Sequence, residues 1–359
     1  MYKIESLSIE EKIAQMIIMD LDKKEITDET YNFISEKKIG GILLYKKNYS
    51  DYKSMINLIN NFKKANSKNE IPLFISIDQE GGRVNRLPEQ IHNLDSAFKL
   101  AQTHDIEKVR QSGQIIGTIL RKSGINLNYA PVLDIKRFSS NHAIGDRCYG
   151  ENKDDVIKYG IEVMKAMQKE NVISAVKHFP GHGQTNKDSH FFLPKITKDI
   201  EVIENEDMKP FEEAIKNNCD AIMVGHLIVK KIDRKNPASL SKKVITKYLK
   251  EKFNFKGLII TDDLKMGAIR LLYRPEVAVY KAILAGNDIV LIGNAENKIE
   301  KIIKYVSKKI AKNKISINQI NESVEKIINM KKKYNINDSK VEGVNIEEIN
   351  KQILEGHAL

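Results

Sequence analysis

Eight short apolar or β-branched segments recur along the 359-residue chain, and longer segments with helical periodicity separate them. The strand-like segments are approximately residues 14–19, 39–44, 71–77, 125–132, 172–176, 221–224, 258–260 and 289–292. The helix-like segments are residues 28–38, 52–65, 106–123, 153–170, 204–217, 242–252 and 276–285, with a terminal one at 319–334. Alternation of strand and helix favours a parallel sheet, and eight repeats predict its closure into a (β/α)8 barrel.

No linker rich in Pro, Gly or Ser divides the chain, so we expect one domain over residues 1–359. Its core would span about residues 7–334, with the terminal helix outside the ring. Residues 335–359 form a polar tail that is too short for a second domain.

The composition, 41% hydrophobic and 30% charged, is that of a soluble globular protein. No apolar run is long enough to span a bilayer, and the first residues lack the apolar stretch of a signal peptide. We therefore expect a cytoplasmic protein that does not bind membranes, with export of a longer precursor as the alternative. Two cysteines, Cys148 and Cys219, are too few for a disulfide framework.

The net charge of +11 comes mainly from lysines in helix-like segments such as residues 301–314. Nucleic-acid binding would favour arginines interleaved with aromatic residues, and these segments have few of either. We interpret the lysines as a solvated surface and expect no nucleic-acid partner. A monomer or a weak homo-oligomer is the expected state.

Polar residues follow seven of the eight strand-like segments, at or just past the C-terminal end of each. They are Asp20, Asp78, Asp134, Lys177 with His178, His226, Asp262 with Asp263, and Asn294. Barrel enzymes build their active sites at this end of the strands, so these residues predict a single pocket.

The segment from Lys177 to His190 contains three histidines, a lysine and an aspartate. Pro180, Gly181 and Gly183 exclude a regular helix, so we expect a loop and not the helical zinc pair that His178 and His182 superficially suggest. Asp188 and His190 are two residues apart and can lie on the same side of an extended loop. An aspartate bonded to a histidine fixes its tautomer and raises its pKa, which makes the histidine a proton donor near neutral pH.

Asp262 directly follows an apolar strand-like run, where a carboxylate would be held rigidly as a nucleophile or a metal ligand. Adjacent strand residues point in opposite directions, so only one of Asp262 and Asp263 should face the pocket. We favour Asp262 and interpret Asp263 as a structural partner or a helix cap. Arg83, Arg86 and Arg147 suit bidentate contacts with carboxylates or acyl oxygens, whereas Cys148 is expected to be a small buried residue.

Together these segments resemble the glycoside hydrolase family 3 β-N-acetylhexosaminidases, the group that includes the bacterial cell-wall recycling N-acetylglucosaminidase. The resemblance extends from about Leu7 to Tyr334. Its markers are Ile77-Asp78-Gln79-Glu80-Gly81-Gly82-Arg83-Val84, Asn128-Tyr129-Ala130-Pro131-Val132-Leu133-Asp134, Ile144-Gly145-Asp146-Arg147, the stretch from Lys177 to His190, and Thr261-Asp262-Asp263-Leu264. The closing Asp188-Ser189-His190 is typical of the hexosaminidase branch of the family.

The resemblance implies a retaining double displacement without cofactor or metal, with Asp262 as nucleophile and His190, oriented by Asp188, as general acid and base. It further implies that the terminal sugar is bound by Asp78, Arg86, Arg147, Lys177 and His178. The expected substrate is a small carbohydrate, a GlcNAc-containing glycoside such as a muropeptide or a chitooligosaccharide. Cys148-Tyr149 stand where the family usually has Ser-Phe, and Gln184 lies where the loop varies.

Three alternatives remain open. A phosphorylase or a broader β-glycosidase could use the same residues, because a histidine acid/base repels an anionic phosphate less than a carboxylate does. A metal-dependent barrel hydrolase could use His178, His182, His190 and Asp262, and a non-catalytic barrel could bind GlcNAc without turnover.

The absence of tryptophan argues against a long cleft in which indole rings stack on a polysaccharide. It favours a small pocket for one terminal sugar, hence exo action.

Overall fold

A computed structural model describes residues 4–137, 143–183 and 193–358. Its main sheet has eight strands, all paired in parallel, in the order β10-β1-β2-β3-β4-β5-β7-β9. These strands are β1 (Ile17–Asp20), β2 (Gly41–Leu44), β3 (Phe74–Ile77), β4 (Leu127–Asn128), β5 (Ile173–Phe179), β7 (Ala221–Val224), β9 (Leu258–Thr261) and β10 (Val290–Leu291). A parallel bridge between Ile260 and Ile289 joins the two end strands. The sheet is thus a closed barrel, which confirms the predicted (β/α)8 class.

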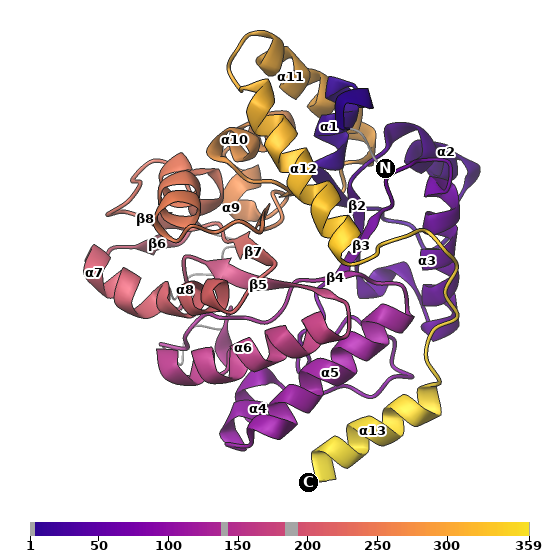
Figure 1. Ribbon diagram of the computed structural model, residues 1–359, viewed down its shortest axis with the longest axis vertical. Helices are drawn as coiled ribbons and strands as arrows, with labels where there is room; N and C mark the ends of the chain where they lie inside the picture. Colours follow the sequence, from indigo (N-terminus) through magenta and orange to yellow (C-terminus); the bar gives the residue numbers. More distant parts are fainter. Residues whose placement is uncertain (1–3, 138–142, 184–192, 359) are drawn as a thin grey trace.

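Helices cover the outside of the barrel (Figure 1). The α-helices are α1 (Ile9–Gln15), α2 (Asp28–Lys37), α3 (Tyr52–Asn66), α4 (Ala97–Gln102), α5 (Ile106–Lys122), α6 (Lys153–Lys169), α7 (Ile200–Val202), α8 (Lys209–Lys216), α9 (Gly267–Arg270), α10 (Pro275–Ala285), α11 (Ile299–Ala311), α12 (Ile317–Lys333) and α13 (Ile346–Ala358). Two π-helical segments, η4 (Ile203–Asp207) and η6 (Lys243–Lys252), complete the layer. A small parallel pair, β6 (Lys195–Ile196) and β8 (Ile228–Val229), lies outside the main sheet.

Local sequence explains where the longer helices begin and how closely they pack. Side chains of Asp51, Asp105 and Asn152 accept bonds from the first backbone amides of α3, α5 and α6. Gly113 lets α5 approach α6, because a Cβ at this position would lie 3.0 Å from both Val163 Cα and Ala166 Cβ. The caps thus fix where these helices begin, and the small size of Gly113 brings α5 against α6.

The structure corrects several of the sequence-based boundaries. The first strand begins at Ile17 and not at residue 14, because Ser8 and Glu11 form a capping box that starts helix α1 at Ile9. The helix expected over residues 204–217 is divided into η4 and α8, and the segment at residues 242–252 is the π-helix η6. The segment predicted as a polar tail contains helix α13.

The C-terminal segment runs from α12 past α3 to α13, which lies beside α5 (Figure 1). Ile349 and Ile353 of α13 are buried in the core, and Tyr52 Oη accepts a bond from Val344 N (2.8 Å). Asn350 donates to Gln90 O and accepts from His92 N, both at 2.8 Å. The last helix is therefore tied to the loop that follows β3.

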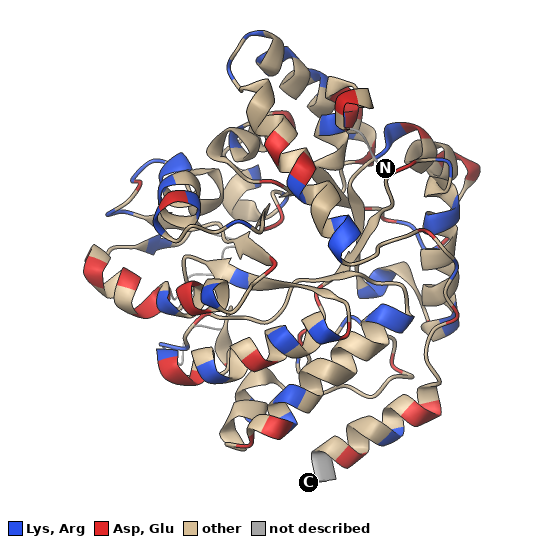
Figure 2. Cartoon of the chain, viewed as in Figure 1, with Lys and Arg blue, Asp and Glu red and all other residues tan. Residues whose placement is uncertain are grey.

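Lysines and acidic residues are intermixed along α5, α6 and α12 (Figure 2). This pattern fits the interpretation of the lysine-rich segments as a solvated surface. Within the described residues, no helix is both long and apolar enough to cross a membrane. The cytoplasmic location stays a prediction.

Candidate functional site

A cavity of about 730 Å³ opens at the C-terminal ends of the barrel strands. It is lined by six of the eight residues with a predicted catalytic or sugar-binding role, namely Asp78, Arg86, Arg147, Lys177, His178 and Asp262. Arg83 and His182, which the sequence analysis also discussed, line it too. Tyr45, Asp263, Lys265 and Arg270 also line it and had no predicted binding or catalytic role. The predicted pocket thus lies at the end of the barrel where it was expected.

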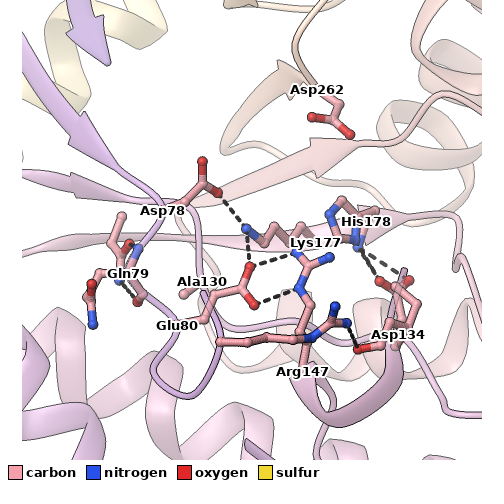
Figure 3. Close-up of polar contacts among 12 residues, drawn as sticks. Asp78, Gln79, Glu80, Ala130, Asp134, Arg147, Lys177, His178 and Asp262 are labelled. Atoms are coloured by element: carbon pink, nitrogen blue, oxygen red, sulfur yellow. Dashed lines mark hydrogen bonds and ion pairs between the residues drawn. The ribbon is translucent and has the colours of Figure 1, made fainter. Parts of the chain in front are cut away.

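A buried chain of ion pairs forms one wall of this cavity (Figure 3). Lys177 Nζ lies 2.6 Å from Asp78 Oδ1 and 2.6 Å from Glu80 Oε1. Arg147 makes the bidentate contact predicted for an arginine fork, with Nε 2.8 Å from Glu80 Oε2 and Nη2 2.7 Å from Oε1. Because each charge has opposite charges beside it, the wall can be buried and rigid at once.

Glu80 was missed as a functional residue, although it lies within a quoted motif. Burial alone would raise its pKa, but the charges of Arg147 and Lys177 hold that pKa well below the usual range of a carboxyl group. Glu80 is therefore a permanent anion that positions two cations. It lies two residues after Asp78 and directly before Gly81 and Gly82, a position that does not by itself indicate this role.

Asp134 organises the two histidines at the end of β5. Its carboxylate lies 2.6 Å from His178 Nδ1 and accepts the backbone amide of His182 at 2.6 Å. Burial would raise the pKa of Asp134, but the histidines lower it, and burial lowers the pKa of His182. Lys177 and His178 belong to strand β5, which ends at Phe179, so the loop starts at Pro180 and not at Lys177.

The arrangement of His178 bears on the metal alternative. Its Nδ1 is engaged with Asp134 Oδ2, and among the described residues no group of three or more His, Cys, Asp or Glu side chains could hold a metal ion. His190 and Asp188 lie outside the described residues, so their predicted pairing stays a prediction.

The loop after β3 is positioned by Gln79. Its side-chain Oε1 accepts the backbone amide of Arg86 at 2.8 Å, and its backbone amide donates to Asn128 Oδ1 at 2.9 Å. Tyr49 Oη donates to Arg86 O at 2.7 Å. Gly81 has φ +88°, a left-handed conformation that favours glycine and turns the chain back toward Arg86. Backbone contacts therefore hold Arg86 at the cavity wall.

Both Asp262 and Asp263 line the cavity, which corrects the expectation that only one would. Strand β9 ends at Thr261, so the alternation of a strand no longer applies to the next two residues. Asp263 Oδ1 accepts the amides of Lys265 and Gly293, both at 2.8 Å. Asp263 is thus a structural partner but not a helix cap, since α9 begins after Met266.

Burial raises the pKa of Asp263 to about 6, and the charges of Asp262 and Asp20 add to this effect.

His226 does not line the cavity. It is fully buried, its Nε2 lies 2.9 Å from Asp263 O, and its Nδ1 lies 2.7 Å from Ser239 Oγ. It therefore supports the Asp262–Asp263 turn from behind.

The remaining residues with sequence-based expectations are structural. Arg83 Nε pairs with Asp146 Oδ1 at 2.7 Å on the cavity rim. Asn294 and Asp20 contact each other at the ends of β10 and β1. Cys148 is fully buried, and burial raises its pKa to about 11, which fits the prediction of a small buried residue.

A closed barrel with a charged cavity at the C-terminal ends of its strands is the architecture of a (β/α)8 enzyme. Residues 8–330 match the glycosyl hydrolase family 3 N terminal domain. The chain belongs to this family and is a glycoside hydrolase.

Named relatives agree with this assignment. The chain is 32% identical to Beta-hexosaminidase A of Pseudoalteromonas piscicida over 85% of its own length, but it spans only 55% of that protein. It is also 32% identical to a Beta-hexosaminidase of Haemophilus influenzae, covering 83% of this chain and 84% of that protein. A family 3 beta-N-acetylglucosaminidase from Paenibacillus sp. superposes with a TM-score of 0.92 at 29% identity, covering 98% of this chain and 68% of that one. The resemblance, fold and enzyme class predicted from the sequence are confirmed.

Proposed function

We propose that this chain is a retaining exo-β-N-acetylglucosaminidase that removes terminal GlcNAc from muropeptides or chitooligosaccharides. The observation that carries the proposal is the shared cavity of Asp262 and the Asp78–Lys177–Glu80–Arg147 ion-pair chain. The named relatives are β-hexosaminidases and a β-N-acetylglucosaminidase, which supports GlcNAc as the sugar removed.

In the proposed reaction, a carboxylate oxygen of Asp262 attacks the anomeric carbon and the glycosidic C–O bond breaks. His190, oriented by Asp188, gives its proton to the departing oxygen. In the second step His190 removes a proton from water, the water oxygen bonds to the anomeric carbon, and the bond to Asp262 breaks. Two inversions retain the β configuration.

The ion-pair wall suits the proposed recognition of sugar hydroxyls. Carboxylates accept from hydroxyl groups, while Lys177 and Arg147 donate to hydroxyl oxygens. Because Glu80 already holds both cations in place, binding the sugar costs little further ordering of these side chains. Together with Arg86 and His178, which line the same cavity, this rigid wall is suited to the binding of one terminal sugar ring.

The decisive experiment compares hydrolysis of an aryl β-N-acetylglucosaminide with that of the matching aryl β-glucoside. Wild type should prefer the acetamido substrate and retain activity in a chelator. Asp262→Asn should lose activity by about 10³-fold or more, as expected for a nucleophile. Asp263→Asn is the matched control, because an amide oxygen can still accept from the amides of Lys265 and Gly293; it should retain activity within about tenfold.

Other outcomes separate the alternatives. Loss of activity in the chelator would overturn the metal-free double displacement. Release of a sugar phosphate when inorganic phosphate is added would identify a phosphorylase. A folded wild type that binds GlcNAc without turnover would contradict the proposal and favour a binding protein.

A further inference from the structure

A second cavity, of about 250 Å³, lies at the opposite, N-terminal end of the barrel. Part of its wall comes from the last turns of α3 and α5 and the turns before β4 and β5, through Lys63, Arg121, Asn126 and Asn171. The rest comes from residues 334–341, which follow α12 and lie beyond the family match at residues 8–330. Nothing in the proposed glycosidase reaction uses this cavity.

Three cations line the second cavity, and none of the described residues lining it is acidic. Lys63 is 5% exposed, whereas Arg121 and Lys340 are exposed at the rim. Lys63 Nζ donates to the backbone oxygen of Ser339 at 3.1 Å. Within the described part of the chain, none of the three cations makes an ion pair. The cavity thus has a positive wall that neutral carbonyl oxygens do not neutralise.

The carboxylate of Asp338 does not line the cavity and is bonded to other groups. Its oxygens accept from Asn66 Nδ2 at 2.6 Å and from Leu73 N at 3.3 Å. Burial lowers the pKa of Lys63; Asp338 opposes this shift, and the charge of Arg121 adds to it. Two charges therefore act on Lys63: Asp338, which does not line the cavity, attracts its ammonium group, and Arg121, which does, repels it.

Basic residues in the last turn of a helix also offset the helix dipole, which accounts for an exposed arginine at the end of α5. It does not account for Lys63, because a buried ammonium group loses its hydration and requires compensation by an opposite charge or by full hydrogen bonding. A small anion between Lys63 and Arg121 would add to the partial compensation that Asp338 provides.

We propose that this second cavity binds a small oxyanion, either inorganic phosphate or a phosphate monoester. The ammonium group of Lys63 and the guanidinium group of Arg121 line one cavity. Together they can bind the tetrahedrally arranged oxygens of a doubly charged phosphate. The volume accommodates a phosphate group with room for a small organic substituent. The bound anion would join the barrel to the segment of residues 334–341.

The test titrates the full chain with inorganic phosphate by calorimetry at constant ionic strength, with chloride as the reference salt. Wild type should bind one phosphate saturably, and Arg121→Gln should weaken binding by about tenfold or more. Lys122→Gln is the matched control: it removes the same charge from the neighbouring exposed residue, which does not line the cavity, and should bind as wild type does. Arg121 is exposed, so its substitution should not prevent folding.

Two further arms distinguish the sources of the anion and the location of the site. Tighter binding of glycerol 3-phosphate than of inorganic phosphate, with no binding of glycerol, would identify a phosphate monoester as the ligand. No saturable binding by wild type would overturn the proposal. Equal binding by wild type and Arg121→Gln, with loss in Arg270→Gln, would also overturn it, because phosphate would then occupy the large cavity instead.

Discussion

The two ends of the barrel each bury a lysine, and the two lysines have different partners. Lys177, at the C-terminal end of the strands, lies 2.6 Å from a carboxylate oxygen of each of two acidic residues. Lys331, at the N-terminal end, donates to Gln15 Oε1 (3.1 Å) and Gly40 O (3.0 Å), and its ammonium group lies 4.5 Å from the centroid of the Phe74 ring. It makes no ion pair with the described residues.

The different partners indicate different roles for the two lysines. Lys177 is part of the wall of the proposed sugar pocket, whereas Lys331 lies at the other end of the barrel and does not line that pocket. At the C-terminal end, the charges of Arg147 and Lys177 keep Glu80 ionised, and the ion pairs fix Lys177 in the cavity wall. At the N-terminal end, burial lowers the pKa of Lys331 to about 7, and the charge of Asp338 opposes this shift only in part, so this lysine can lose its proton near neutral pH. Substitution of the two lysines should therefore have unequal consequences.

The largest effect is expected for Lys177→Met. The substitution leaves Asp78 and Glu80 without their shared cation, so the free energy of unfolding should fall by about 3 kcal/mol. Activity on the aryl β-N-acetylglucosaminide should fall by about 100-fold or more. Urea unfolding and kcat/KM measure the two effects. Lys331→Met should keep activity within about twofold, and equal losses in both variants would remove the distinction between the two ends.

The next effect concerns pH and Lys331. Between the native pKa of about 7 and the unfolded value of about 10.4, the unfolded chain binds more protons than the native protein. The stability of wild type relative to Lys331→Met should therefore rise with pH, by about 1 kcal/mol per pH unit between pH 7.5 and 9.5. Chemical unfolding at several pH values measures this slope. Parallel curves for the two proteins would show that Lys331 keeps an ordinary pKa.

Asp263 should show the opposite sign. Its native pKa of about 6 lies above the unfolded value of about 3.9, so the native protein binds more protons between these values. The stability contributed by its protonated form is full below pH 4 and is lost as the pH rises through 6. Asp263→Asn should therefore be more stable than wild type by about 2 kcal/mol at pH 7.5, with little difference near pH 4. Thermal unfolding at both pH values checks this, and a constant difference would contradict it.

The smallest expected effect links the C-terminal helix to the sugar pocket. Asn350→Ala removes two hydrogen bonds to the loop that carries Arg86, which should raise KM about threefold and leave kcat unchanged. Lys351→Ala, the next and exposed residue of α13, is the control and should behave as wild type does. An unchanged KM for Asn350→Ala would show that the loop holds its position without the helix.

The barrel could be predicted from the sequence because its strands are short apolar runs between amphipathic helices. The start of the first strand was misplaced because Ala14 is apolar in either structure; the capping pair of Ser8 and Glu11 was the available signal for a helix. Asp262 and Lys177 were predicted because each lies at or just after the end of a strand. These positions depend on local sequence alone.

Other site features depend on contacts between distant residues. Glu80 acquires its role from Arg147, 67 residues away, and no local pattern distinguishes it from Asp78. Asp263 faces the cavity because the chain leaves the strand at Thr261, which period-two alternation could not predict. The buried state of Lys63 depends on residues 334–341, a segment that the sequence indicated only as a polar tail.

The tie between α13 and the loop after β3 bears on how the chain should be divided for experiments. A fragment cut at the boundary of the family match, residue 330, would still contain every strand of the barrel and every named residue of the large cavity. It would lack Asn350, so the backbone amide of His92 and the backbone carbonyl of Gln90 would lose their hydrogen-bond partner. Kinetic constants measured on such a fragment would describe a sugar pocket whose Arg86 loop lacks its hydrogen bonds to α13, and not the pocket of the whole chain.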